Sequence, residues 1–174
     1  EMEKKAVAEA LDNIPRQEFA RAVDALAKAA HITTCASGSS GIAAKKFAHS
    51  LCCIERPAQF MPPCEAVHGG LGCVQKDSAV VMVSRGGKTA ELLPVIDVVV
   101  KKGAALIAVT ENADSPLARA ASVVLPMNIS READPINAMA TASYVATIAI
   151  FDALLAAVMV DTGYRQEQFA LIHP

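Results

Sequence analysis

Residues 79–91 read AVVMVSRGGKTAE, and the order of residue types in this segment indicates the fold class. Its first five residues are all apolar, which is typical of a strand that is buried on both faces of a parallel sheet. A polar, glycine-rich loop follows at 84–89, and a helical pattern then runs to about Lys102, with Gly103 as its stop. The stretch therefore predicts a strand, a polar loop and a crossover helix in succession.

The same unit recurs along the chain on both sides of this stretch. Further short apolar runs, with helical segments between them, lie at 32–35, 59–61, 105–109 and 122–125. This alternation predicts an α/β fold, a single doubly wound domain whose five-stranded parallel sheet is flanked by helices. The first run ends in the polar loop 37–41, before a helix over about 44–51. Ligands of such sheets bind at the carboxyl ends of the strands, where both loops fall.

The chain begins and ends with helical patterns. Apolar residues recur at helical steps over the first thirty residues, and Pro15 divides this region into two helices. We expect residues 1–30 to form an N-terminal helical segment and residues 31–174 to form the ligand-binding domain. A long apolar helix runs from about Asn137 to Val160 and contains Asp152. An aspartate in hydrocarbon costs about 2.5–3.5 kcal/mol, so this pattern favours a buried helix in a soluble assembly over a membrane span.

The composition narrows the classes of partner. The 174 residues include 16 Lys and Arg against 18 Asp and Glu, 4% aromatic residues and no Trp. This balance argues against binding to nucleic acid and to an anionic membrane surface. Hydrophobic residues make up 53% of the chain. That surplus of apolar residues suggests surface buried against another copy, and we expect a homo-oligomer.

The spacing of the cysteines and glycines limits which cofactors the chain is expected to bind. The five cysteines are odd in number, irregularly spaced and without a CxxC pair. This pattern favours reduced thiols in the cytoplasm and gives a metal site little support. Neither polar loop has the Walker A or GxGxxG spacing. We therefore expect no cofactor and no metal, and a small phosphorylated metabolite as the ligand.

Both polar loops have the residue types that bind phosphate. Free N–H groups and the positive end of the helix dipole attract anions at a helix start, and hydroxyl groups add donors. The alternative is that the same hydroxyl groups only cap helices. The candidate substrate-binding residues of the two loops are Ser37, Gly38, Ser39, Ser40, Ser84, Gly86, Gly87 and Thr89.

An ordered series of segments carries a family resemblance. The segments EAVHGGLG (65–72), SRGGKTAE (84–91), EADP (132–135) and FALIHP (169–174) follow one another in the chain. The chain resembles a sugar isomerase (SIS) domain and, more narrowly, the arabinose-5-phosphate isomerase group of phosphosugar isomerases. The resemblance implies a phosphorylated sugar as substrate and aldose–ketose isomerisation through an enediol. It also implies a homodimer or homotetramer whose site is shared between subunits.

The resemblance assigns roles to four residues. It implies catalytic roles for Glu91, Glu132 and His173 and a substrate contact for His68. Carboxylates and histidines suit this reaction, because it needs a base for a carbon-bound proton and an acid for the oxygens. Each of these residues could instead have a purely structural role. Glu91 could stabilise a helix N-terminus and Glu132 could be a capping carboxylate. The histidines could lie on the surface or in the core.

Several positions depart from the family pattern. The catalytic lysine of the family GKSG motif is replaced by Ser39, and the aspartate of HGDLG is replaced by Gly70. A histidine that contacts metal in some members is replaced by Pro62. Loss of the lysine removes a cation that would stabilise negative charge. Arg85 and Lys88 in the second loop are candidates to restore it.

Two other functions stay open. One is a regulatory SIS domain that binds a sugar phosphate without turning it over, and the other is a different SIS isomerase such as a 6-phospho-3-hexuloisomerase. The sequence leaves open the sugar, the glutamate that acts as base, the oligomeric state and whether further domains follow. Because His173 lies near the end of the chain, we expect it to reach a neighbouring subunit, with the helix 137–160 at the interface.

Overall fold

The computed structural model describes residues 1–173, so Pro174, the last residue of the FALIHP segment, lies outside the described residues. The strands are β1 His31–Cys35, β2 Ala58–Phe60, β3 Ser78–Val83, β4 Ala105–Thr110 and β5 Val123–Pro126. The helices are α1 Met2–Asp12, α2 Arg16–Lys28, α3 Gly38–Cys52, α4 Pro63–Ala66, α5 Leu93–Lys102, α6 Pro116–Ala120, α7 Ala142–Thr162 and α8 Gln166–Ile172. Two short 3₁₀ helices are η1 Gly70–Cys73 and η2 Ala90–Leu92.

The five strands form one parallel sheet in the order β2-β1-β3-β4-β5. This confirms the predicted α/β class and the five-stranded parallel sheet. Strand order reverses between β1 and β3, since β2 lies on one side of β1 and all later strands lie on the other. A crevice for ligands forms at such a reversal, at the carboxyl ends of the strands. Both predicted polar loops follow these two strands.

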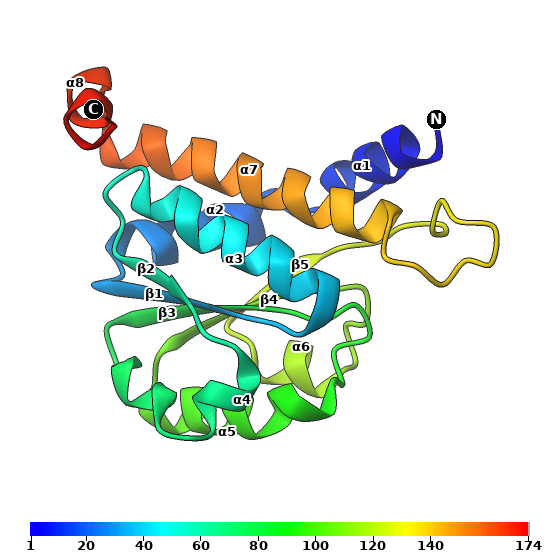
Figure 1. Ribbon diagram of the computed structural model, residues 1–174, viewed down its shortest axis with the longest axis horizontal. Helices are drawn as coiled ribbons and strands as arrows, with labels where there is room; N and C mark the ends of the chain where they lie inside the picture. The colour runs from blue at the N-terminus through cyan, green and yellow to red at the C-terminus, as the bar shows by residue number, and fades with distance from the viewer. Residues whose placement is uncertain (174) are drawn as a thin grey trace.

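Helices cover both faces of the sheet (Figure 1). Helices α1, α2, α3 and α7 lie over one face, and α4, α5 and α6 lie over the other. The run 79–83 is apolar throughout because its side chains alternate between the two layers. Val81 and Val83 join the core beneath α3 and α7, whereas Val80 and Met82 join the core above α5. A strand buried on both faces loses the polar alternation of a surface strand.

The long apolar helix α7 belongs to the core of the domain. It is long and apolar enough to cross a membrane by length and composition, which is weak support for a span. It packs against α1, α2 and α3, and Phe151 stacks on Phe47 of α3 with ring centroids 4.3 Å apart. Asp152 lies on its half-exposed side and pairs with Lys46. The N-terminal helices add Ala10, Leu26 and other residues to the same core cluster.

Two helix boundaries differ from the sequence prediction. Helix α3 begins at Gly38, not near residue 44, so the predicted first loop supplies the first turn of the helix. Helix α7 begins at Ala142, not near Asn137, and residues 128–141 form a loop that projects from the domain (Figure 1). Asp134 holds this loop, because its carboxylate accepts hydrogen bonds from the N–H groups of Ile136, Ala138 and Met139. Such local bonding favours a turn over a helix.

Candidate functional site

The first polar segment, residues 37–41, forms the N-cap and first turn of α3 and lies close to the end of β1. A Cβ at Gly41 would lie 2.9 Å from the carbonyl oxygen of Ala36, so glycine permits this approach. Ser37 is the N-cap residue, with extended backbone and no capping bond from its side chain. Gly38 follows with φ of 59°. The Ser37 hydroxyl and the first N–H groups of α3 are therefore not used to close the turn.

The second polar loop, after β3, is held by its own hydroxyl groups. The hydroxyls of Ser84 and Thr89 lie 2.8 Å apart, and the N–H of Gly87 donates to Ser84 Oγ at 3.0 Å. Ser84 is buried. Its hydroxyl thus shapes the loop itself and does not cap the helix that follows. Thr110 Oγ1 donates to the carbonyl of Arg85 and ties the loop to the end of β4.

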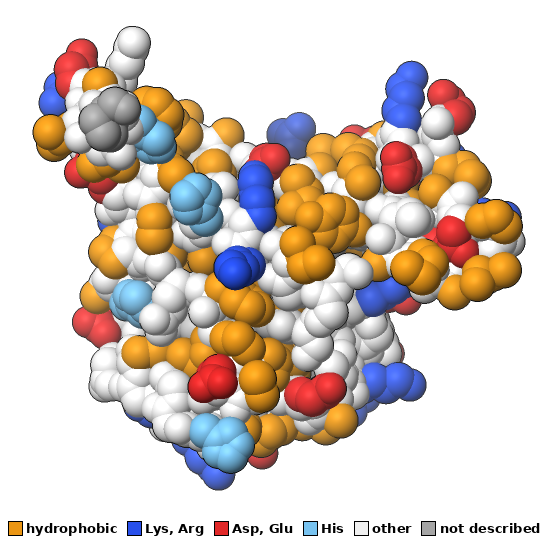
Figure 2. Space-filling model, viewed as in Figure 1, with side chains coloured by type: hydrophobic (Ala, Val, Ile, Leu, Met, Phe, Trp, Pro, Cys, Tyr) orange, Lys and Arg blue, Asp and Glu red, His pale blue; other side chains and the backbone are white. Residues whose placement is uncertain are grey.

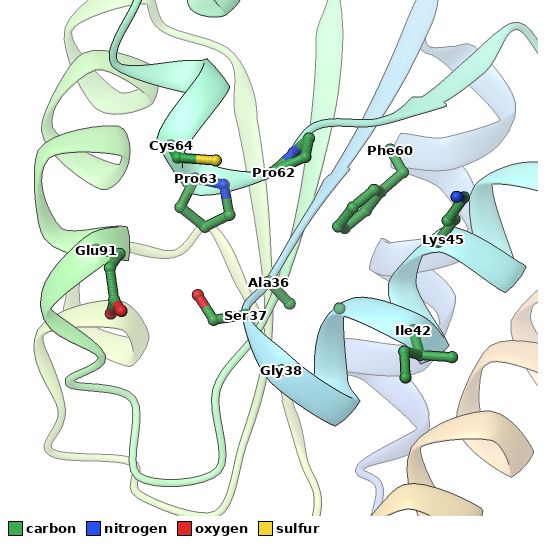
Figure 3. Close-up of a pocket in the computed structure, with 11 residues that line it drawn as sticks. Ala36, Ser37, Gly38, Ile42, Lys45, Phe60, Pro62, Pro63, Cys64 and Glu91 are labelled. Atoms are coloured by element: carbon green, nitrogen blue, oxygen red, sulfur yellow. The ribbon is translucent and has the colours of Figure 1, made fainter.

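A cleft with a volume of about 410 Å³ opens beside the first loop, between α3, the segment after β2 and the start of η2. Figure 3 shows Glu91 on one side, Ile42 and Lys45 of α3 on the other, and Ser37 between them. Of the predicted residues, Ser37, Gly38 and Glu91 line the cleft. Ser39, Ser40, His68, Ser84, Gly86, Gly87 and Thr89 do not line it.

Several residues of the cleft were not predicted. The strand β2 and the segment after it contribute Phe60, Pro62, Pro63 and Cys64, and α3 contributes Lys45. The signal for Lys45 is helical spacing, since positions 38, 41, 42 and 45 share one helix face. The contribution of β2 had no comparable signal, because it depends on strand order. His68 is exposed on the turn that follows α4.

Glu91 is a carboxylate with no internal partner. It lies in the short helix η2 directly after the second loop, and its side chain is exposed to the cleft. Within residues 1–173 it forms no side-chain hydrogen bond and no ion pair. Such a carboxylate is free to accept a proton from a bound ligand.

Glu132, unlike Glu91, is buried and fully hydrogen-bonded. It is 1% exposed, and its Oε2 accepts hydrogen bonds from the N–H groups of Thr141 and Ser143 and from the Thr141 hydroxyl. Arg85 donates to its Oε1 at 2.9 Å. Burial raises the pKa of Glu132, but the hydrogen bonds from Ser143 and Thr141 outweigh burial and lower the pKa below its ordinary value. Glu132 therefore anchors the start of α7 as a carboxylate.

The cations of the second loop are directed away from the cleft. Arg85 is held between two carboxylates, Glu111 and Glu132, each at 2.9 Å. Lys88 lines a separate surface hollow with Glu111 and Asn112. Neither residue lines the cleft that contains Glu91. The structure therefore does not bring these candidate cations to the place where we expected them to restore positive charge.

His173 lies far from the cleft of its own chain. Helix α8, which ends just before it, is attached beside the C-terminal end of α3, where Gln168 donates to Glu55 and Tyr164 donates to the carbonyl of Cys53. Ser37 lies at the other end of α3, and 15 helical residues extend about 22 Å. The His173 ring is exposed and stacks on Phe169 at 3.8 Å between ring centroids. One chain alone does not unite His173 with Glu91.

The side chains that could bind a metal ion are not grouped together in the described part of the chain. Among residues 1–173, no three His, Cys, Asp or Glu residues lie together as a metal site would need. All five cysteines are free, and Cys64 lies in the wall of the cleft. Burial raises the pKa of the nearby Cys35 thiol to about 12, with a smaller contribution from Cys64. Cys35 is thus an inert core thiol.

Comparison with known proteins gives the same family as the motifs. The SIS domain model matches residues 25–157. Arabinose 5-phosphate isomerase KdsD of Pseudomonas aeruginosa is 36% identical over 174 residues, covering 99% of this chain and 53% of that protein. The chain spans about half the length of the curated relatives it matches.

Solved structures share the whole fold. A crystal structure described as a putative sugar-phosphate isomerase from Listeria monocytogenes matches with a TM-score of 0.94 and 42% identity, covering 99% of this chain and 91% of that one. An E. coli CFT073 protein in complex with arabinose 5-phosphate matches with a TM-score of 0.92 and 32% identity, covering 99% and 92%. The motifs, the parallel sheet and these matches agree, and the chain belongs to the SIS domain family.

Proposed function

We propose that this chain is a phosphosugar isomerase that interconverts an aldose phosphate and a ketose phosphate, of the arabinose 5-phosphate and ribulose 5-phosphate type. One observation carries the proposal. The unpartnered carboxylate of Glu91 lines the same cleft as Ser37 and the N-terminus of α3, at the reversal of strand order. A relative of the same fold has been solved with arabinose 5-phosphate bound.

The chemistry needs one base that works on two neighbouring carbons. In the open-chain aldose, Glu91 removes the proton from C2, and the electron pair of the broken C–H bond forms the C1–C2 double bond of the enediol. The carbonyl oxygen at C1 takes a proton. Return of a proton to C1, with loss of the proton on the C2 oxygen, gives the ketose. A carboxylate free of internal partners suits the first step.

We assign the base to Glu91 and not to Glu132. All the described hydrogen bonds of the Glu132 carboxylate come from donors on Arg85, Thr141 and Ser143, and its side chain is 2% exposed. A carboxylate stabilised in its charged form by four hydrogen bonds is a poor acceptor of a carbon-bound proton. Glu132 then acts on the reaction by positioning Arg85 and the second loop.

We propose that the working site is shared between two copies in a homodimer or homotetramer, in which a partner's copy of His173 completes the cleft and assists ring opening. The distance along α3 between α8 and Ser37 supports this arrangement. The free state of all five cysteines is compatible with the cytoplasm as the compartment.

The rival function is a sensor that binds a sugar phosphate without turning it over. The observation in its favour is Ser39, which stands where the family carries a catalytic lysine. A 6-phospho-3-hexuloisomerase is a second rival, and a panel of substrates separates it from the arabinose type.

Proton exchange in deuterated water tests these functions. The protein is incubated with pentose and hexose phosphates, and deuterium uptake at C1 and C2 is followed by NMR. We expect uptake with ribulose 5-phosphate, a loss of about 100-fold or more in Glu91→Gln, and retained binding in that variant. Glu3→Gln, at an exposed position on α1, is the control. Binding without exchange on any sugar would contradict the isomerase and favour the sensor.

A further inference from the structure

One face of α3 lines a groove longer than the cleft itself. Residues Gly38, Gly41, Ile42 and Lys45 line the cleft, and Lys45, Ala48, His49 and Cys52 line a second cavity of about 440 Å³. These positions follow one another at helical spacing. Lys45, Phe60 and Pro62 belong to both cavities, so the two adjoin at Lys45.

Lys45 is set apart from the neighbouring cations by its lack of an ion pair. Its neighbour Lys46 pairs with Asp152 of α7, and Arg85 is bound by Glu111 and Glu132. Within residues 1–173, no carboxylate lies within 4.0 Å of Lys45. An ammonium group without a counter-ion at the edge of a cleft is free to pair with an anionic ligand.

The charges on the two sides of the cleft are opposite. Glu91 and Lys45 are the charged residues in its lining, and they stand on different sides with Ser37 between them (Figure 3). A phosphate dianion is repelled by the Glu91 carboxylate and attracted by Lys45 and by the N–H groups at the start of α3. A sugar phosphate bound across the cleft would therefore be favoured with its phosphate toward α3 and its reacting carbons toward Glu91.

We propose that Lys45 is the cation that binds the substrate phosphate, in a cleft where Ser39 provides no positive charge. This inference rests on the proposed function only for the identity of the sugar. The positive charge of Lys45 favours a phosphorylated ligand whether or not the protein turns that ligand over. The three-donor ammonium of Lys45 provides charge-assisted hydrogen bonds that the Ser39 hydroxyl cannot provide.

A pair of lysine variants on the same helix tests the inference. Binding of arabinose 5-phosphate and of unphosphorylated arabinose is measured by calorimetry for the full chain, Lys45→Met and Lys46→Met. We expect the Kd for arabinose 5-phosphate to rise about tenfold or more in Lys45→Met and to stay within about twofold in Lys46→Met. Lys45→Arg should restore most of the affinity, because it keeps the positive charge. Binding of unphosphorylated arabinose should not differ among the proteins.

The outcomes separate this inference from the isomerase proposal. Equal affinity of wild type and Lys45→Met for arabinose 5-phosphate would overturn the role of Lys45, even if the protein catalyses proton exchange. Equal losses in Lys45→Met and Lys46→Met would also overturn it, because they would reflect net charge alone. If binding depends on Lys45 but no exchange occurs, the phosphate contact stands and the isomerase proposal fails.

Discussion

Gly87 occupies a position in the second loop that no other residue fits. Its φ is 64°, and a Cβ there would lie 2.0 Å from Ser115 Oγ and 3.0 Å from Thr110 Oγ1. Ser115 cannot easily yield, because its hydroxyl caps α6 by accepting from the N–H of Ala118. The loop after β3 and the start of α6 are thus fitted to each other at this glycine.

Substitution of Gly87 by alanine should strongly destabilise the protein. The left-handed conformation costs about 1–2 kcal/mol for a residue with a side chain, and overpacking adds about 1–3 kcal/mol. The free energy of unfolding of Gly87→Ala, measured by urea denaturation, should fall by about 2–5 kcal/mol. Gly86→Ala is the matched control, since its Cβ would meet nothing closer than Lys88 Cγ at 3.9 Å. Equal stability of the two variants would contradict this explanation.

Residue patterns predicted part of the cleft and missed the rest for a physical reason. Ser37, Gly38 and Glu91 lie where the polar loops meet the strand ends, and the rule for parallel sheets places them in the cleft. Arg85 and Lys88 belong to the second loop, but neither side chain lines the cleft. The direction of Arg85 depends on carboxylates at 111 and 132, which are distant in sequence and reach it only in the folded chain.

At the scale of elements, the loop between β5 and α7 is held by Glu132. Its carboxylate accepts from the N–H groups of Thr141 and Ser143, which have no partner within the first turn of α7. The Arg85 bond joins this helix start to the loop after β3. One buried side chain therefore links α7 to the rim of the cleft.

Acid should weaken this link. The pKa of Glu132 in the folded chain lies below its ordinary value of 4.5, so its contribution to stability is complete above pH 4.5 and is lost as the pH falls through the folded value. Glu132→Gln should lower the free energy of unfolding by about 1–3 kcal/mol at neutral pH. The variant should also lose less stability than wild type between neutral pH and about pH 3. Urea denaturation at both pH values measures this difference.

The control for this prediction is Glu3→Gln, an exposed position on α1. It should leave both the stability and its pH dependence unchanged. If Glu132→Gln keeps the full acid sensitivity of wild type, other carboxylates cause it and Glu132 does not hold the start of α7.

Helix boundaries were harder to predict than helix positions. Apolar spacing located α3 and α7, and Gly103 ends α5 in the left-handed conformation that its type predicts. The spacing did not show that residues 38–41 would enter the helix or that residues 137–141 would leave it. The start of α7 depends on side-chain bonds of Asp134 and Glu132, and apolar periodicity contains no information on them.

At the scale of the whole molecule, apolar surface remains uncovered in one chain. Ile136 and Met139 in the projecting loop are 77% and 64% exposed, and Ile42 beside the cleft is 63% exposed. Figure 2 shows hydrophobic side chains along this face of the molecule, over the projecting loop and the adjoining helices. Patches of this kind mark interaction surfaces. A second copy that covers them would lie next to the cleft, where it could contribute residues.

A mixing experiment tests whether two chains build one site. Glu91→Gln and His173→Asn should each be inactive when pure, if the cleft uses Glu91 from one chain and His173 from its partner. In a mixed dimer, one of the two clefts then contains both natural residues, and the other contains neither. Random re-association of equal amounts should therefore restore about a quarter of the wild-type rate of proton exchange with arabinose 5-phosphate, the sugar whose ring must open before the proton is removed. A site contained within one chain predicts no recovery in the mixture, and sedimentation of the protein as a monomer would likewise contradict a shared site.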